Sequence, residues 1–214
     1  MASLAQGHEK ITLGLLTLLP VILFYSLKFQ ILIFSFFIIL IVLSGHLYFF
    51  RDPNRKIDIN SDLILAPADG KIYQIDRDQG IIRIRMNIFN VHVTRIPVSG
   101  NIINIEFKKG KNWPFFLFLS RGTTENSRQI ILIENSVGKF VVTQIVGILA
   151  RKCVCYFEEN DKIQQGDRLG MIYYGSETDI HFPPDKFDIL VNEKDKSIAG
   201  ITPLAKLKDN IKTI

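Results

Sequence analysis

The dipeptide Gly175-Ser176 carries two groups that can react with each other. In a strained Gly-Ser peptide the serine hydroxyl can attack the preceding carbonyl, so that the acyl group moves from nitrogen to oxygen. Gly175 favours this attack, because a residue without Cβ tolerates unusual backbone angles and leaves its carbonyl open. A nearby base could then eliminate the ester, leaving a dehydroalanine that hydrolyses to a pyruvoyl group and separates residues 1–175 from residues 176–214. A Gly-Ser pair is equally typical of a plain turn, so the rest of the chain must decide.

Asp69 and His92 are candidates for the proton transfers that such a serine needs. Asp69, followed by a glycine, is on its own typical of a turn, and His92 lies in an alternating apolar stretch where a partly buried structural histidine is usual. A histidine oriented by an acid is nevertheless what removes a proton from a reactive serine. No metal is predicted, because the four histidines are scattered and Cys153 and Cys155 have no second pair to complete a zinc site.

The apolar residues of the chain are concentrated at its amino end. The 214 residues are 47% hydrophobic, and residues 11–50 contain a single charged residue, Lys28. The net charge is +5, but the basic residues are dispersed rather than gathered on one helix. This favours an acidic lipid surface over nucleic acid as the anionic partner. We therefore predict a membrane-associated protein that does not bind nucleic acid.

Residues 29–50 form an apolar run that is long enough to span a bilayer. As a helix, its 22 residues measure about 33 Å, against a hydrocarbon core of about 30 Å. The preceding run, residues 11–27, is at the lower limit of length and contains Pro20, so it either spans the bilayer or re-enters it as a kinked helix. Basic residues flank the pair of runs, Lys10 before it and Arg51 after it, which places both flanks in the cytoplasm.

Beyond residue 50 the pattern changes to short alternating runs separated by turns, which is typical of β structure. We predict a mainly β fold, with a sandwich-like or barrel-like β domain at residues 51–214 and an apolar, membrane-associated helical hairpin at residues 1–50. The candidate strands are residues 72–75, 81–89, 102–107, 129–134, 140–148, 151–157, 169–174 and 187–191. Residues 108–119 combine lysines, a tryptophan and an apolar run, which is typical either of an interfacial segment or of a core element after a solvated loop.

Four further stretches accompany the Gly-Ser element. They are Phe49-Phe50-Arg51-Asp52-Pro53-Asn54-Arg55, Ala66-Pro67-Ala68-Asp69-Gly70-Lys71-Ile72, Met86-Asn87-Ile88-Phe89-Asn90-Val91-His92-Val93-Thr94-Arg95-Ile96-Pro97-Val98-Ser99-Gly100 and Asn160-Asp161-Lys162-Ile163-Gln164-Gln165-Gly166-Asp167. In this order, and together with Gly166-Asp167-Arg168-Leu169-Gly170-Met171-Ile172-Tyr173-Tyr174-Gly175-Ser176, they resemble the small form of phosphatidylserine decarboxylase. The resemblance runs through about residues 5 to 192, the apolar amino end included.

The resemblance implies a lyase that is made as a zymogen and cuts itself between Gly175 and Ser176. Ser176 would become the covalent pyruvoyl cofactor, which forms a Schiff base with phosphatidylserine and gives CO₂ and phosphatidylethanolamine. The products of the cut, residues 1–175 and 176–214, would stay together as a heterodimer, with a higher oligomer left open. Membrane association at the cell (inner) membrane and a cytoplasmic catalytic domain are also implied.

The resemblance also implies roles for the helper residues. Asp69, His92 and Ser176 would act as orienter, general base and nucleophile of self-cleavage. Larger members of the family carry a His-x-x-His-x-Pro element, and Arg95 stands here where the second histidine would be. His92 would then act in self-cleavage, in decarboxylation or in both, and Arg95 would bind the carboxylate or phosphate of the substrate. The sequence after Ser176 also departs from the family's Leu-Gly-Ser-Thr, so no role is carried over to the residues that follow.

Two alternatives remain open from the sequence. A decarboxylase of another serine-headgroup phospholipid, of the archaetidylserine type, would use the same headgroup chemistry. The turn at residues 161–167 is also similar to turns of sandwich-barrel carrier modules, so a non-catalytic, membrane-anchored binding module is the alternative from another class.

Overall fold

The computed structural model describes residues 3–4, 9–26, 30–110, 125–147, 153–173 and 176–211. The chain divides into two compact units, Met1–Asn54 and Arg55–Ile214, which we call the helical unit and the β unit. The predicted segment at residues 108–119 lies, from residue 111 onward, outside the described residues.

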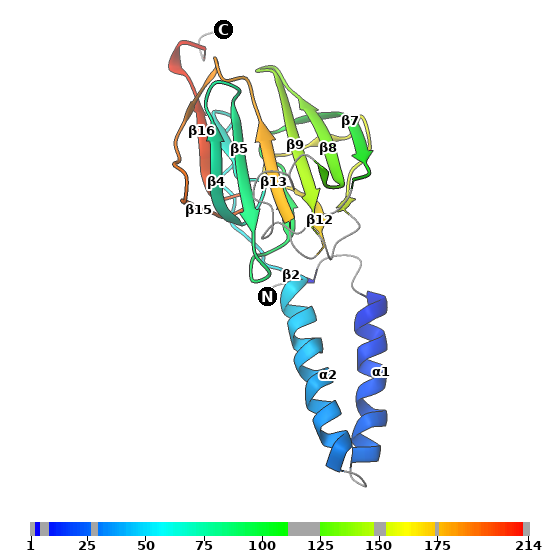
Figure 1. Cartoon of the computed structure of the whole chain (residues 1–214). Helices are drawn as coiled ribbons and strands as arrows, with labels where there is room; N and C mark the ends of the chain where they lie inside the picture. The colour runs from blue at the N-terminus through cyan, green and yellow to red at the C-terminus, as the bar shows by residue number, and fades with distance from the viewer. Residues whose placement is uncertain are drawn as a thin grey trace. The chain divides into compact units, whose positions relative to one another are not determined.

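The helical unit consists of two antiparallel helices (Figure 1), α1 (Glu9–Ser26) and α2 (Gln30–Phe49). A short antiparallel pair, β1 (Ser3–Leu4) with β2 (Arg51–Asp52), accompanies them. Pro20 lies inside α1, which continues through it. In α2 the window Leu32–Phe49 is long and apolar enough to cross a membrane, whereas the apolar part of α1, Ile11–Tyr25, is shorter. The predicted apolar helix pair at the amino end is confirmed.

The β unit is built from short antiparallel strands. Their bounds are β3 (Leu63–Leu65), β4 (Gly70–Asp76), β5 (Ile81–Met86), β6 (Val93–Arg95), β7 (Gly100–Lys108), β8 (Arg128–Glu134), β9 (Lys139–Val146), β10 (Cys153–Cys155), β11 (Lys162–Ile163), β12 (Arg168–Ile172), β13 (Ser176–His181), β14 (Phe187–Ile189), β15 (Lys196–Ser197) and β16 (Pro203–Leu207), followed by the 3₁₀ helix η1 (Asp209–Ile211). The prediction of a mainly β fold is therefore confirmed.

An eight-stranded sheet curls into half a barrel and contributes the largest share of the core side chains of any sheet. Its strand order is β11-β7-β8-β9-β13-β5-β4-β15, so that β13 runs between β9 and β5 (Figure 1). Two three-stranded sheets, β10-β12-β6 and β14-β16-β3, complete the unit. The core side chains are mostly β-branched, as β-sheets favour, and include Ile72, Ile82, Ile84, Ile131, Ile133, Val142 and Ile180.

Strand β13 was not among the predicted strands, although it is an interior strand of the sheet. Its residues alternate in the ordinary way: Thr178 and Ile180 are fully buried on one face, while Glu177 and Asp179 point to the other. The strand was not predicted because of its two carboxylates: acidic residues are depleted in strands and suggest a solvated loop. Here both are buried against arginines of β5.

Candidate active site

Ser176 is the first residue of β13 and is paired on both sides. Its partners in the register are Met86 of β5 and Val146 of β9. Gly175 and the side chain of Ser176 lie outside the described part of the structure. The backbone of residue 176 is therefore placed by two ladders of hydrogen bonds that continue to His181.

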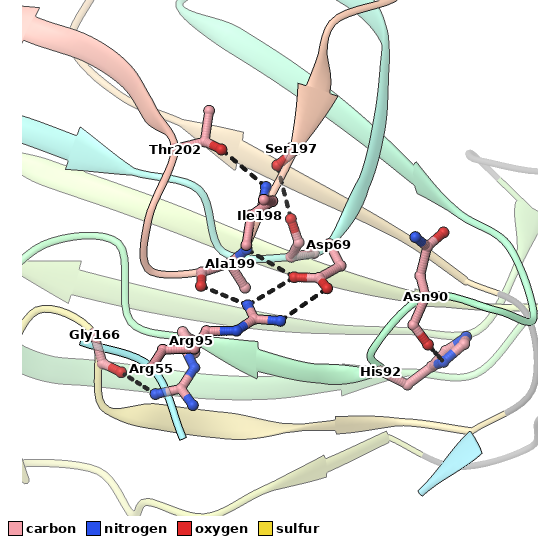
Figure 2. A network of polar contacts seen from close by, with 11 residues as sticks. Arg55, Asp69, Asn90, His92, Arg95, Gly166, Ser197, Ile198, Ala199 and Thr202 are labelled. Carbon is pink, nitrogen blue, oxygen red and sulfur yellow. Dashed lines mark hydrogen bonds and ion pairs between the residues drawn. The ribbon is translucent and has the colours of Figure 1, made fainter. Parts of the chain in front are cut away.

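His92 is hydrogen-bonded to β12, the strand that precedes Ser176 in the chain. It directly precedes β6, and its carbonyl accepts a hydrogen bond of 3.2 Å from the N–H of Ile172, four residues before Ser176. The side chain of His92 is fully buried. Its Nδ1 lies 3.0 Å from the carbonyl oxygen of Asn90 (Figure 2). Because a carbonyl only accepts hydrogen bonds, Nδ1 carries the proton, and Nε2 holds the basic lone pair of the neutral ring.

Asp69 is held by a bidentate ion pair with Arg55 (Figure 2). The guanidinium nitrogens lie 2.7 and 2.8 Å from the two carboxylate oxygens, and the two side chains are only 8% and 13% exposed. The N–H of Ala199 also donates to Asp69, at 2.8 Å, and Arg55 donates to the carbonyl of Ala199, at 2.6 Å. The network therefore connects segments far apart in the sequence, residues 55 and 69 with residue 199.

The contacts described for Asp69 and for His92 form separate groups in Figure 2. Asp69 is engaged with Arg55 and Ala199, whereas the ring of His92 is bonded to the backbone at Asn90. The role of Asp69 as the orienter of His92 stays a prediction. A backbone carbonyl already performs the orienting task in these contacts.

Arg95 is buried, and its guanidinium donates to the carbonyl of Gly166 at 2.9 Å (Figure 2). It lines a cavity of about 500 Å³ together with Arg55 and Arg168. Arg95 pairs with Arg168 at the start of β12, whereas His92 bonds to Ile172 at its end. Four residues of strand separate these levels by roughly 13 Å, at about 3.3 Å per residue. The role of Arg95 in binding substrate stays a prediction.

Sequence reasoning missed a buried polar cluster beside position 176. Gln144 of β9 lies opposite Thr178, two residues after Ser176, and donates to the hydroxyl of Thr94 at 2.7 Å. Thr94 in turn donates to the carbonyl of Gly170 at 3.2 Å. Within the described residues, the Gln144 Oε1 and the Thr178 hydroxyl have no hydrogen-bond partner. In the sequence, the only indication of this cluster was that Gln144 and Thr94 are polar residues within mostly apolar stretches. No local pattern shows that β6, β9 and β13 meet.

The other face of β13 carries a buried acidic pair. Glu177 is fully buried, with Arg85 Nη2 2.7 Å from one oxygen and the Tyr73 hydroxyl donating to the other at 2.9 Å. The Arg85 guanidinium also lies over the Tyr73 ring, 4.2 Å from its centroid. Burial raises the pKa of Glu177, and Arg85 partly offsets this. Burial, with Glu177 next in importance, likewise raises the pKa of Tyr73.

Asp179 lies two residues further along β13 and faces Arg83 at 3.4 Å. Burial raises the pKa of Asp179 to about 7, the nearby Arg83 opposes the shift, and Glu177 adds to it. The two cross-strand pairs, Glu177 with Arg85 and Asp179 with Arg83, join β13 to β5. They are the charged contacts nearest in sequence to Ser176 among the described ion pairs.

The model of the phosphatidylserine decarboxylase family matches residues 45–205, a range that includes Asp69, His92 and Ser176. The chain belongs to the phosphatidylserine decarboxylase family. It is therefore a decarboxylase, and the resemblance inferred from its motifs is confirmed.

Relatives of this decarboxylase cover most of its length. A Methanosarcina mazei protein provisionally named an archaetidylserine decarboxylase proenzyme is 42% identical over 162 residues, 76% of this chain and 75% of that protein. The phosphatidylserine decarboxylase proenzyme of Wolbachia pipientis wMel is 39% identical over 180 residues (77% and 76%). That of Magnetococcus marinus is 36% identical over 183 residues (79% and 82%).

Loss of Arg55 should strongly destabilise the decarboxylase. Arg55→Met would leave the Asp69 carboxylate nearly buried with no cation, which costs roughly 3–5 kcal/mol. In a domain of this size we expect the thermal midpoint, measured in detergent, to fall by about 10 °C. The double variant Arg55→Met/Asp69→Leu should recover part of the loss, because the buried charge is gone.

The matched control for Arg55 is the exposed pair of Lys139 and Glu134, 3.9 Å apart with side chains 64% and 45% exposed. Lys139→Met should leave the midpoint almost unchanged, since exposed ion pairs contribute little. Equal shifts for Arg55→Met and Lys139→Met would contradict the role given to the Asp69 ion pair.

Asp179 should make the decarboxylase less stable as the pH rises from about 4 to 7. Its pKa is raised to about 7 in the folded protein, from an ordinary 3.8. The folded state therefore binds the extra proton in this window, and stability falls by up to about 1.4 kcal/mol per pH unit. Asp179→Asn should lose this dependence, so its thermal midpoint relative to the parent protein should rise between pH 5 and pH 8.

Arg83 provides the internal check for Asp179. The arginine lowers the pKa of Asp179, so Arg83→Met should extend the loss of stability to higher pH. A parent protein and an Asp179→Asn variant with parallel midpoints from pH 5 to pH 8 would exclude the titration of this carboxyl.

Proposed function

We propose that this decarboxylase cuts its own chain between Gly175 and Ser176, converts Ser176 to a pyruvoyl group, and then decarboxylates phosphatidylserine to phosphatidylethanolamine. The observation that carries the proposal is the position of Ser176 at the start of a strand held on both sides, with His92 bonded to the strand that leads into it. The proenzyme names of its relatives support self-processing.

His92 is the general base of the cut in this proposal. Its Nδ1 donates to the carbonyl of Asn90, which leaves Nε2 free of its own proton and able to take the proton of the Ser176 hydroxyl. Full burial of the ring keeps water from competing for Nε2. In the decarboxylation, the same nitrogen is suited to return a proton to the carbon that has lost CO₂.

The residues around position 176 fit a pyruvoyl group. A serine preceded by a glycine is the precursor that the group requires. The hydrogen-bonding capacity left in the buried Gln144 and Thr178 side chains suits a polar group at this level of the sheet. Once formed, a pyruvoyl group supplies the electron sink that ordinary side chains lack for the electrons released with CO₂. The chain's own part is to hold residue 176 fixed and to move protons through His92.

The two products of the cut would remain together as a heterodimer. Residues 176–214 supply β13 between β5 and β9, β15 beside β4, and β16 beside β3. The bonds of Asp69 and Arg55 to Ala199 cross the same boundary. These contacts make the association independent of the peptide bond at residue 175.

The helical unit supports residence in the cell (inner) membrane, where the substrate lies. α2 is long and apolar enough to cross, and its surface residues Phe34 and Ile41 are each 71% exposed. With Lys10 and Arg51 flanking the helix pair, the positive-inside rule puts the β unit on the cytoplasmic side.

Purified protein in uncharged detergent micelles tests the proposal. A denaturing gel and intact mass should reveal two chains, 1–175 and 176–214, and the small chain of 39 residues should resist amino-terminal sequencing. The same preparation should release CO₂ from phosphatidylserine. Release of CO₂ by a single chain with the full translated mass would overturn the proposal.

Archaetidylserine is the second candidate substrate, because a relative with 42% identity carries that name. The two lipids share the serine phosphate headgroup and differ in their tails. Parallel assays with both lipids in the same micelles decide between them. A kcat/KM for archaetidylserine more than ten-fold above that for phosphatidylserine would reassign the substrate and leave self-cleavage untouched.

A further inference from the structure

A row of basic side chains crosses neighbouring strands next to the position of Ser176. Lys196 of β15 lies opposite Lys71 of β4. Lys71 lies opposite Arg85 of β5, and Arg85 lies opposite Glu177 of β13. Like charges directly opposite each other on adjacent strands are destabilising. The packing of the sheet therefore does not explain why three cations follow one another in this row.

Lysines of this region have no described carboxylate partners. Arg85 is neutralised by Glu177, but within the described residues no carboxylate lies within 4.0 Å of the ammonium groups of Lys71, Lys194 or Lys196. The two acids next to Lys194 accept hydrogen bonds from backbone N–H groups instead. Lys194 itself has a φ of 77°, a backbone angle that residues other than glycine adopt at a cost. Three positive charges are thus left for an external anion.

All four cations line one cavity of about 220 Å³, which we call the basic cavity. Asn87 and Asn90 add polar groups to its wall, and the described lining contains no acidic residue. Gly70 forms part of the floor, where a Cβ would overlap the carbonyl of Arg85. The volume and the donors suit a phosphate-sized anion.

The basic cavity lies at the same end of the sheet as Ser176, on the face of β13 that carries Glu177 rather than the face that carries Thr178. Arg85 and Asn87 flank Met86 in the chain, and Met86 is the partner of Ser176 in the register. Asn90, on the same wall, orients His92. In a serine phospholipid only one oxygen and one carbon separate phosphorus from the carbon that loses CO₂. A headgroup whose amine meets residue 176 must therefore carry its phosphate close by.

We propose that the basic cavity binds the phosphodiester group of the substrate lipid. The inference rests on the proposed function and adds the site that holds the phosphate of the lipid headgroup. A turn locked by Asn87 and Asn90 presents Ile88 and Phe89, 58% and 67% exposed, next to the cavity. This apolar tip is where the tails of a bound phospholipid, which begin beyond its phosphate, meet the protein.

The test is the KM for phosphatidylserine in uncharged detergent micelles, after a gel has established the extent of processing. Lys71→Met and Lys196→Met should each raise KM roughly ten-fold, because a hydrogen bond to a charged group is worth about that factor, while kcat changes little. Lys71→Arg should stay near the parent value. The control is Lys206→Met, which removes an exposed strand lysine outside the cavity and should not change KM.

Two further measurements separate the sources of phosphate. sn-Glycerol 3-phosphate should inhibit the parent protein competitively and should inhibit Lys71→Met much less. Vesicles of phosphatidylglycerol should bind the parent protein and the lysine variants to similar extents. A fall in vesicle binding with an unchanged KM would mean that the lysines meet the bilayer surface rather than the substrate, and would overturn the proposal.

Two other outcomes also count against a phosphate site in the basic cavity. An unchanged KM together with unchanged inhibition by glycerol phosphate would overturn the inference. If the lysine variants fail to process, the parent protein alone decides, since inhibition that is absent or not competitive contradicts a phosphate site. Failure of the proposed function looks different, because the parent protein would then release no CO₂ at all.

Discussion

Ser176→Ala should leave one chain of 214 residues that releases no CO₂ from phosphatidylserine. The alanine has no hydroxyl to attack the Gly175 carbonyl, so neither the cut nor the ketone can form. We expect the loss to reach the detection limit of the assay, because without the electron sink no side chain of the protein stabilises the carbanion. Intact mass and a CO₂-release assay on the same preparation measure both effects.

The control for Ser176→Ala is Ser136→Ala, which removes an exposed serine from the turn between β8 and β9. It should process and react like the parent protein. Ser176→Thr keeps a hydroxyl on a bulkier residue and should cut more slowly than the parent rather than not at all. Substantial CO₂ release by uncut Ser176→Ala would contradict the self-processing mechanism and favour a decarboxylation chemistry that needs no pyruvoyl group.

His92→Ala should slow self-cleavage by 10² to 10⁴-fold, the range typical of a lost general base. The ring is fully buried, and its Nδ1 donates to Asn90, which makes Nε2 the reactive nitrogen. The rate is read from a time course of the two bands after synthesis. CO₂ release per processed molecule, measured separately, tells whether His92 also serves the decarboxylation.

A merely structural His92 would give a different pattern. His92→Gln fills nearly the same space without a base, so cleavage should be as slow as in the alanine variant while the thermal midpoint is largely retained. Added imidazole should partly restore cleavage in His92→Ala but not in His92→Gln. The matched control is His181→Gln on β13, a half-buried histidine that should cut at the parent rate. Normal cleavage in His92→Gln would remove His92 from the mechanism.

The sequence motifs predicted the family, the mainly β fold and the apolar helix pair, since each depends on local composition or short spacing. Strand β13 escaped prediction because the burial of its Glu177 depends on Arg85, a residue 92 positions away in the chain. The partners of Asp69 were equally hidden, since Ala199 lies 130 residues further on. Long-range pairing of this kind leaves no periodic signal in one sequence.

The basic cavity illustrates the same limit. Its lysines come from β4, from β15 and from the turn before β15, and only the register of the sheet lines two of them up with Arg85. In the sequence they are ordinary exposed lysines. The register also relates them to Ser176, through the pairing of Met86 with that serine.

The interior position of β13 bears on whether folding or the proposed self-cleavage comes first. Without β13, residues 1–175 would lack the strand between β5 and β9. The backbone donors and acceptors along the facing edges of β5 and β9 would then be unpaired. In the proposed self-cleavage, the whole chain must therefore fold before the bond between Gly175 and Ser176 is cut. In that proposal the uncut peptide bond keeps the last 39 residues close to their place in the sheet, and it is no longer needed once β13 is paired with β5 and β9.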